Sequence, residues 1–322
     1  MEYKTLGNSG LKVSTLCLGT MTFGGEADEA TSKAIYHAAK DKGINFFDTA
    51  NIYNNGTSEK ILGKLIHEHR DEVVIATKAY FPTGEGVNDK GLGRGHLIKA
   101  LDDSLKRLNT DYIDLYYAHA FDENTPLEET LATFDNFVKQ GKVRYLGLSN
   151  FAAWQVMKAI AVTQQNNYTP ISVIQPMYNL VKRQCESELL TMALSEGLGV
   201  ASYSPLGGGL LTGKYKTDKK EGRFAESTMY QKRYNDEITY KTVDSYVDFA
   251  NQNNLNPVSL AIAWVKAHKA ITAPLIGARN LEQLKPALAS LDIHMTEELR
   301  TKITDLSPEM VLATGHKKGE RS

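Results

Sequence analysis

A carboxylate, a phenol, an amine and an imidazole occur near the ends of three successive apolar runs of this sequence. They are Asp48 and Tyr53 around NFFDTA (45–50), Lys78 at the end of VVIATK (73–78), and His119 within YIDLYYAHA (112–120). The intervals between these runs are long enough for one helix each. If the runs are neighbouring strands of a parallel barrel, their ends lie on one rim, which is where such barrels place active sites. Side chains of these four types suit proton transfer to a carbonyl group.

Tyr53 is the candidate proton donor, but a free tyrosine has a pKa near ~10, too high for efficient donation at neutral pH. An ammonium group about 4 Å away, at an effective dielectric constant of about 20, would favour the phenolate by about 4 kcal/mol, or roughly three pKa units as an upper bound. A buried lysine without a partner tends to lose its charge. We therefore expect Asp48 to keep Lys78 protonated. Lys78 would then lower the pKa of Tyr53, and His119 would hydrogen-bond the substrate oxygen.

Each of these residues also has an ordinary structural interpretation. Asp48 could cap the following turn, and Tyr53 could be a surface aromatic. Lys78 could be solvated, and His119 could be a histidine satisfied within the core. Taken one at a time, these interpretations are favoured. Because one strongly apolar run ends in a lysine and another ends near a histidine, a cooperative site is the better interpretation of the set.

The composition argues against several classes of protein. The 322 residues include 37 basic and 38 acidic side chains, a formal charge of −1 that gives no electrostatic reason to expect nucleic acid or an anionic membrane as a partner. Two cysteines, Cys17 and Cys185, are too few and too far apart for a disulfide framework. The first ten residues lack the apolar core of a signal peptide, and no run of ~20 apolar residues could span a bilayer. We expect a soluble cytoplasmic protein.

Strand and helix patterns alternate along the chain. The segment KTLGNSGLKVS (4–14) predicts a β-hairpin. Eight strand-like runs follow, at 15–20, 45–50, 73–78, 112–120, 143–150, 173–179, 199–206 and 271–278. Helical patterns come after them, near 29–42, 58–69, 95–108, 126–140, 152–165, 186–196, 236–253, 257–268 and from about 281. Strands that are each followed by a helix predict an all-parallel sheet.

These patterns predict an α/β fold, a single (β/α)8 barrel over residues 1–322 with an N-terminal β-hairpin and a long loop after the seventh strand. Length alone would permit two domains, but no linker rich in proline, glycine or serine divides the chain. The alternative is an open doubly wound sheet, whose first strand should lead into a glycine-rich nucleotide-binding turn. After 15–20 the chain instead reads MTFGGEADE, which lacks that spacing, so the barrel is favoured.

Two prolines mark predicted helix starts. In TPLE (125–128), a capping threonine, a proline at the first helical position and a capping-box glutamate predict a helix there. Gly141 predicts where that helix ends. Asn256 and Pro257 predict another helix start in the same way.

Two glycine-rich motifs suggest nucleotide binding but do not support it well. GLGRG (91–95) is preceded by a loop instead of a strand, which favours a helix-entry loop over a dinucleotide fingerprint. GGLLTGK (208–214) follows a strand, but Tyr215 stands where a serine or threonine should hold magnesium, which argues against an NTPase. Contact of its backbone amides and Lys214 with some phosphate stays open.

Longer motifs, in this order, resemble the aldo-keto reductase family. They are FDTANIYNNGTSEKILG (47–63), TKAYFP (77–82), LDDSLKRLNTDYIDLYYAHAFDENTPLEETL (101–131), GKVRYLGLSN (141–150), SYSPLGGGLLTGKY (202–215) and PLIGARNLEQL (274–284). The likeness runs from Tyr3 to about Ala289. It is to the aryl-alcohol-dehydrogenase-like members and to the potassium-channel β subunits.

The resemblance implies a (β/α)8 barrel in which a reduced nicotinamide donates hydride to an aldehyde or ketone, without a metal. Tyr53 matches the family's proton donor, and Asp48, Lys78 and His119 complete its tetrad. Besides Asp48, the positions implied to contact the cofactor are Thr20 and Met21 near the nicotinamide ribose, Ser149, Asn150 and Gln175 at the carboxamide, Tyr203 on the nicotinamide ring, Ser204, Pro205, Leu206, Gly208, Lys214 and Arg223 at the pyrophosphate, and Gly277, Arg279 and Gln283 at the adenosine 2′-phosphate. Without the resemblance, Ser149-Asn150 would be interpreted as a helix cap and Tyr203 as a core residue.

Arg279 sets the expected cofactor preference. A guanidinium suits a phosphate dianion by charge and by bidentate geometry, so we expect NADPH in preference to NADH. One departure concerns the adenine, because Pro286-Ala287 stand where relatives often carry Glu-Asn, and these side chains cannot form the same hydrogen bonds. The substrate pocket is expected to draw on Thr22, Phe23, Tyr80, Phe121 and the loop around 224–235.

Two functions are open on these grounds. The first is an NADPH-dependent carbonyl reductase acting on a small-molecule carbonyl, or in reverse on an alcohol. The second is a cofactor-binding regulatory subunit of the channel β-subunit type with little turnover. Those subunits generally have asparagine where this chain has His119, so the intact tetrad favours turnover.

Overall fold

The computed structural model describes residues 1–216, 228–234 and 236–311. At its centre, eight strands run parallel in the order β10-β3-β4-β5-β6-β7-β8-β9. They are β3 (Cys17–Gly19), β4 (Phe46–Asp48), β5 (Val74–Ala79), β6 (Ile113–Ala118), β7 (Val143–Ser149), β8 (Ile171–Gln175), β9 (Gly199–Val200) and β10 (Leu275–Ile276). Each overlaps a strand-like run predicted from the sequence.

Backbone hydrogen bonds between the two ends of this strand order close the sheet. The N–H of Thr272 donates to the carbonyl of Val200 at 2.9 Å, and the N–H of Leu275 donates to the carbonyl of Ser202 at 2.8 Å. The segments around β9 and β10 are therefore neighbours. The sheet curls into a ring, and the predicted (β/α)8 barrel is confirmed.

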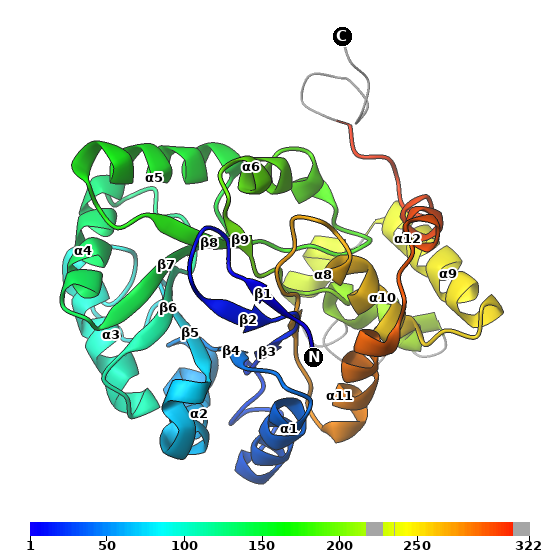
Figure 1. Cartoon of the computed structure of the whole chain (residues 1–322), viewed down its shortest axis with the longest axis horizontal. Helices are drawn as coiled ribbons and strands as arrows, with labels where there is room; N and C mark the ends of the chain where they lie inside the picture. The colour runs from blue at the N-terminus through cyan, green and yellow to red at the C-terminus, as the bar shows by residue number, and fades with distance from the viewer. Residues whose placement is uncertain (217–227, 235, 312–322) are drawn as a thin grey trace.

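Helices surround the strand ring (Figure 1). They are α1 (Glu29–Asp41), α2 (Thr57–Ile66), α3 (Arg94–Leu108), α4 (Leu127–Lys139), α5 (Ala153–Asn166), α6 (Leu189–Ser195), α8 (Thr228–Tyr234), α9 (Glu237–Gln252), α10 (Pro257–Lys266), α11 (Leu281–Leu288) and α12 (Glu297–Thr304). Short 3-10 turns occur at Tyr53–Gly56, His67–Glu72, Gln184–Glu186, Gly207–Thr212, Lys214–Lys216 and Ala289–Asp292. Helices α8 and α12 were not predicted. Among the described residues, no helix combines the length and apolarity needed to cross a membrane.

The two predicted helix starts have different outcomes. Asn256 caps α10 as predicted, because its side chain accepts hydrogen bonds from the N–H groups of residues 258 and 259. The capping box at 125–128 is wrong. Helix α4 begins at Leu127 without a side-chain cap, and the hydroxyl of Thr125 donates to the carboxylate of Asp122 at 2.7 Å. A charged acceptor makes the stronger hydrogen bond and holds the threonine away from the helix end.

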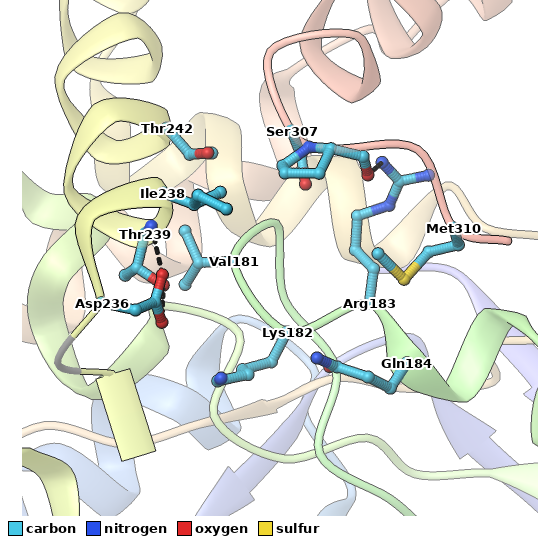
Figure 2. Close-up of a pocket in the computed structure, with 11 residues that line it drawn as sticks. Val181, Lys182, Arg183, Gln184, Asp236, Ile238, Thr239, Thr242, Ser307 and Met310 are labelled. Atoms are coloured by element: carbon cyan, nitrogen blue, oxygen red, sulfur yellow. Dashed lines mark hydrogen bonds between the residues drawn. The ribbon is translucent and has the colours of Figure 1, made fainter. Parts of the chain in front are cut away.

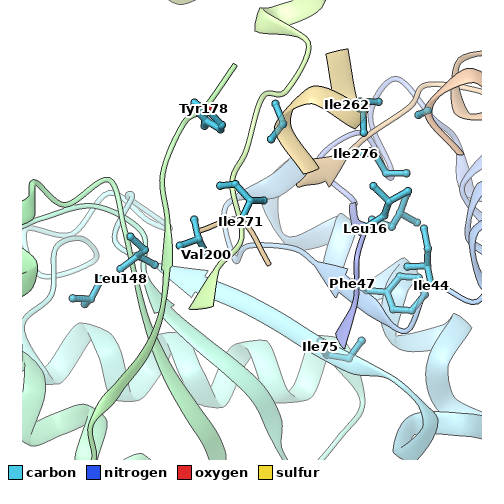
Figure 3. Packing of buried hydrophobic residues seen from close by; sticks show 14 of the residues in the cluster. Leu16, Ile44, Phe47, Ile75, Leu148, Tyr178, Val200, Ile262, Ile271 and Ile276 are labelled. Carbon is cyan, nitrogen blue, oxygen red and sulfur yellow. The ribbon is translucent and has the colours of Figure 1, made fainter. Parts of the chain in front are cut away.

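Alternate residues of each strand face two separate apolar cores. Phe47 and Ile75 belong to the outer core, a cluster that also contains helix residues such as Ile262, and Figure 3 shows part of this cluster. Phe46 points into the barrel instead, where it packs with the other inward-facing strand residues. This alternation is the two-residue period of a strand, and it explains why the strands are apolar nearly throughout.

The N-terminal hairpin closes one end of the barrel. Strands β1 (Tyr3–Thr5) and β2 (Lys12–Ser14) pair antiparallel, and Figure 1 shows them lying across the strand ring. Leu6 and Val13 of this hairpin belong to the core inside the barrel. The hairpin meets the starts of the strands, since the N–H of Ser14 bonds the side chain of Asn45 just before β4. The opposite rim, where the strands end, is left for the candidate site.

Stability of the ring depends on close contact between β6 and β7. Gly147 of β7 lies against the ring of Tyr117, and a Cβ at residue 147 would be 2.4 Å from atoms of that ring. We expect Gly147→Ala to lower the free energy of unfolding by about 1–3 kcal/mol, because the closely packed strands of the barrel have little room to move apart. Urea unfolding followed by circular dichroism measures this change.

Gly95→Ala is the matched control for this substitution. A Cβ at Gly95 meets nothing within 4 Å, and alanine is favoured inside helix α3. Its free energy of unfolding should stay the same or rise by up to about 1 kcal/mol. Equal stability of the two variants would contradict the close contact described for β7.

Candidate active site

A buried ion pair between Lys78 and Asp48 lies at the rim where the strands end. Lys78 is completely buried, and its Nζ donates to Asp48 Oδ1 and, at 2.8 Å, to the carbonyl of Thr49. The other carboxylate oxygen of Asp48 accepts a hydrogen bond from Gln175 Nε2 at 2.8 Å. Strands β4, β5 and β8 therefore each contribute a group to one network.

The charges of this pair keep Lys78 protonated. Burial lowers the pKa of Lys78, but the charges of Asp48 and Tyr53 outweigh that effect, and the pKa is raised above its usual value. Burial also raises the pKa of the Asp48 carboxyl, an effect that Lys78 and Gln175 oppose. An ammonium group is thus held inside the barrel rim at neutral pH.

Tyr53 lies beside this ammonium group. The centre of its ring is 5.3 Å from Lys78 Nζ. Tyr53 begins the 3-10 turn after β4, where Asn54 takes a left-handed conformation with φ of 48°. The side chain of Asn54 donates to the carbonyls of Met21 and Phe23 at 2.9 and 2.8 Å, which fixes the turn that carries the phenol.

His119 follows β6 and completes the group. Its ring meets that of Tyr53 edge-on, with 5.9 Å between the ring centres. Burial, together with the charge of Lys78, holds the pKa of His119 well below its usual range, so the imidazole is neutral at neutral pH. Its Nδ1 is buried and has no hydrogen-bond partner among the described residues. Buried polar atoms are normally bonded, so an unbonded nitrogen at this position is unusual.

The ends of β7, β8 and β9 carry a second network next to the first. The hydroxyl of Tyr203 donates to Asn150 Oδ1 at 2.7 Å, and Asn150 Nδ2 donates to Ser149 Oγ at 3.1 Å and to the carbonyl of His119 at 2.8 Å. Ser149 Oγ in turn donates to the carbonyl of Gln175 at 2.9 Å. The structure brings these four sequence-predicted residues together beside the ion pair.

The loop after β9 carries four further candidates. Ser204 has a left-handed conformation, with φ of 60°, and its carbonyl accepts hydrogen bonds from Asn179 Nδ2 and from Gly207 N–H. Pro205 is buried and Leu206 half-buried, whereas Gly208 has φ of 69°. The rim loop is therefore tied to the segment after β8.

Of the two basic residues predicted to lie at the pyrophosphate, the structure describes Lys214 but not Arg223. Lys214 is exposed, with Nζ 4.8 Å from the centre of the Tyr215 ring. Arg223 lies outside the described residues, as do residues 224–227 and 235 of the predicted pocket loop.

Candidates at β3 and β10 divide into buried and accessible residues. Thr20 is completely buried, and its hydroxyl bonds Ser58 Oγ at 2.8 Å and the carbonyl of Asp48 at 3.1 Å, so it fixes the end of β3 next to Asp48. Met21, by contrast, is exposed. Gly277 follows β10 directly.

Arg279 and Gln283 meet at the start of α11. Arg279 Nη2 is 3.4 Å from Glu26 Oε1, and Gln283 Oε1 accepts a hydrogen bond from the N–H of Arg279 at 3.1 Å. Farther along this helix, Ala287 is buried and the carbonyl of Pro286 accepts from Ser259. Neither of these two side chains offers a polar group, as the sequence predicted.

The structure separates the residues predicted for the substrate pocket into a buried pair and an accessible pair. Thr22 and Phe23 are buried, with the Thr22 hydroxyl bonded to the carbonyl of Ala278 and Phe23 in the outer core, so neither lines an open hollow. These two residues of the loop are turned away from solvent, because the polar side chain of Thr22 forms its hydrogen bond within the protein. Tyr80 and Phe121 do line a hollow, together with Ala120, Glu123, Asn124, Asn150 and Gln155.

Two aromatic residues near this hollow were missed from the sequence. Phe81 packs edge-on against His119, with ring centres 4.9 Å apart. Trp154, which is 62% exposed, packs on Phe121. Position after a strand end was the available signal for Phe81. For Trp154 the signal was an aromatic in the first turn of α5, which is also where helices carry ordinary surface residues.

Another cavity lies away from these residues (Figure 2). It is formed by the segment after β8, the start of α9 and residues 307–310. Arg183 crosses it and donates to the carbonyls of Thr304 and Pro308. None of the four candidate catalytic residues lines this cavity, so the strand-end rim is the better candidate site.

Comparison with known proteins identifies the family. The model of the aldo/keto reductase family matches residues 15–307. The chain belongs to this family. The resemblance inferred from its motifs is confirmed.

Relatives of this aldo/keto reductase cover nearly its whole length. The "Uncharacterized oxidoreductase YrpG" of Bacillus subtilis (strain 168) is 39% identical over 319 residues, 96% of each chain. A "Probable voltage-gated potassium channel subunit beta" of Oryza sativa subsp. japonica is 36% identical over 321 residues, 97% of this chain and 94% of the relative. "Protein tas" of Escherichia coli (strain K12) is 35% identical over 337 residues, 94% of this chain and 96% of the relative.

The stability of this reductase should depend on both partners of the buried ion pair. Lys78→Met leaves the Asp48 carboxylate buried without its counter-charge, and we expect the free energy of unfolding to fall by about 3–5 kcal/mol. Adding Asp48→Asn should recover much of that loss, because the unpaired charge is then gone. Urea unfolding of the single and double variants measures both changes.

Lys64→Met is the control, since Lys64 forms an exposed pair with Glu29. Its loss should be below about 1 kcal/mol. A Lys78→Met variant no less stable than this control would contradict the role given to the buried pair.

A separate prediction concerns pH. His119 stays neutral in the folded protein below the pH at which an unfolded chain protonates it, about 6.5. The unfolded state therefore takes up the extra proton, and this position lowers stability as the pH falls below that value. His119→Asn should reduce the loss by up to about 1.4 kcal/mol per pH unit, measured as unfolding free energies at pH 7.5 and 5.5.

His294→Asn, at an exposed position, serves as the control for the pH experiment. It should keep the pH dependence of the unaltered protein. An identical pH dependence in His119→Asn would show that this imidazole is not held neutral by the fold.

Proposed function

We propose that the protein is an NADPH-dependent aldo-keto reductase that reduces an aldehyde or ketone, with Tyr53 as the general acid. The single observation that carries the proposal is the buried Lys78–Asp48 pair next to the Tyr53 ring. An ammonium group that is kept charged there favours the phenolate that a proton donor leaves behind. We assign the activity to one barrel domain over residues 1–322.

The residues at the rim fit a nicotinamide dinucleotide. At one end, the side chains of Ser149, Asn150 and Gln175 place hydrogen-bonding groups beside His119. At the other end, Arg279 and Lys214 provide cations suited to phosphates. A bound reduced nicotinamide supplies the hydride. We assign the carboxamide to Ser149, Asn150 and Gln175, and the ring face to Tyr203.

Side chains of the protein itself supply the proton and stabilise the group that donates it. In our proposal the Tyr53 hydroxyl donates its proton to the carbonyl oxygen as negative charge develops there. The ammonium of Lys78 stabilises the resulting phenolate, and Asp48 keeps that ammonium in place and charged. His119, as a neutral imidazole, hydrogen-bonds and orients the substrate oxygen. The same groups permit alcohol oxidation in the reverse direction.

The phosphate contacts complete the assignment. We place the pyrophosphate against the loop of residues 204–208 with Lys214 and Arg223. We place the adenosine 2′-phosphate against Gly277, Arg279 and Gln283. With Thr22 and Phe23 buried, we assign the substrate to the hollow lined by Tyr80 and Phe121.

Tyr53→Phe tests the proposed acid. The substitution removes the hydroxyl and keeps the ring, so we expect turnover of an aldehyde to fall by about 10²–10⁴-fold. NADPH affinity, measured by quenching of protein fluorescence, should change little. Reduction at an unchanged rate would remove Tyr53 from this role, and loss of NADPH binding would indicate that the substitution had damaged the cofactor site instead.

A cofactor-holding regulatory subunit is the second candidate. Two plant relatives are named as probable voltage-gated potassium channel beta subunits, and the similarity of this chain to them favours the second candidate. His119 argues for turnover, because channel β subunits generally have asparagine at this position whereas this chain keeps all four residues of the proposed tetrad. A screen of aldehydes, ketones and sugars, followed by NADPH consumption, separates the two candidates. Tight NADPH binding without consumption across the whole screen would favour the subunit.

A further inference from the structure

An ion pair joins the loops that follow β3 and β10, two neighbouring strands of the barrel. Glu26, between β3 and α1, has its Oε1 3.4 Å from Nη2 of Arg279, which follows β10. The side chains of Glu26 and Arg279 are 40% and 26% exposed. Both charged groups can therefore be reached by a ligand at this part of the rim.

The turn that carries Glu26 is held from two sides. The Thr22 hydroxyl donates to the carbonyl of Ala278 at 2.7 Å, one residue before Arg279. On the other side, the Asn54 side chain bonds the carbonyls of Met21 and Phe23. Because these bonds link the turn to the loop of its partner, the carboxylate faces the guanidinium as a consequence of the fold.

The turn also has its own internal bonds. The N–H groups of Gly25 and Ala27 both donate to the carbonyl of Thr22, at 3.1 and 3.0 Å. On the arginine side, Gln283 holds the N–H of Arg279, and the Asn280 side chain caps α11. Hydrogen bonds support both of the loops that carry these charged residues, so the fold fixes the distance between the carboxylate and the guanidinium.

The chemistry of the two groups bears on how an adenosine ribose is recognised. In dinucleotide sites, an acidic side chain that accepts a hydrogen bond from the ribose 2′-hydroxyl favours NAD, whereas an arginine accommodates the 2′-phosphate of NADP. Here one residue of each kind lies within a single ion pair. A 2′-phosphate would be attracted by Arg279 and repelled by Glu26, while a 2′-hydroxyl could donate to Glu26.

We propose that Glu26 is a specificity-determining residue that weakens the preference for NADPH, so that this chain binds both NADPH and NADH. The inference rests on the proposed function, in that it places the adenosine ribose at Arg279. It adds a residue, Glu26, that no motif or pattern of the sequence singled out. The consequence is that removing one negative charge sharpens the cofactor preference.

The test measures binding and not turnover. The full chain and its Glu26→Gln variant are titrated with NADPH and with NADH, following the quenching of protein fluorescence. We expect the Kd for NADPH to fall about two- to fivefold in the variant, the range for one exposed charge interaction. The Kd for NADH should stay the same or rise. Arg279→Gln should shift the ratio of the two Kd values the opposite way.

Glu29→Gln is the matched control, because Glu29 is an exposed carboxylate three residues along the chain that pairs with Lys64. It removes the same charge and should leave both Kd values unchanged. An NADPH affinity that is unchanged or weaker in Glu26→Gln would overturn the inference and leave the proposed function standing. If the unaltered protein bound neither dinucleotide, the proposed function and this inference would both fail.

Discussion

Placing Lys78 and Asp48 inside a protein costs several kcal/mol of desolvation free energy for each charge, and their mutual attraction offsets this only when every remaining polar atom is also bonded. The barrel meets this condition for the carboxylate and for two of the three N–H groups of the ammonium. The ammonium has two acceptors, and the carboxylate has a donor on each oxygen. Because the donors and acceptors come from strands β4, β5 and β8, the pair can form only when these strands are in register.

The rest of the site is arranged around this constraint. The ammonium lies close enough to Tyr53 and His119 to act on both, and it helps to keep the imidazole neutral. The strands hold the charged pair, whereas turns after the strands hold the phenol and the imidazole. Groups that must stay fixed are thus buried in the sheet, and groups that must meet a ligand lie on its rim.

The sequence predicted those parts of the molecule whose signal is local. Apolar strands, amphipathic helices and a charged residue at the end of an apolar strand each leave a pattern within ten or so residues, and these predictions hold. Helix α12 was missed because it is only eight residues long and fully buries a single apolar side chain, that of Ile303, so its apolar pattern is weak. Thr125 was misjudged because Asp122, a stronger acceptor, stands three residues earlier.

The burial of Thr22 and the ion pair of Glu26 could not be predicted, because each depends on a partner far along the chain. Thr22 is buried because its hydroxyl meets Ala278, and Glu26 is of interest because it meets Arg279. No local pattern reports such a meeting, since both partners are ordinary loop residues when considered alone. The family resemblance identified Arg279 but not its counter-charge, because a resemblance transfers matched motifs and not the new contacts of one chain.

The hairpin that closes one end of the barrel affects how ligands reach the candidate site. Leu6 and Val13 pack into the interior, so within the described part of the chain the hairpin covers the end of the barrel opposite the candidate site. Two ligands that share one opening cannot bind and leave independently of each other. In the proposed function, the cofactor and the substrate would share this opening, and the one that lies deeper would have to bind first and leave last.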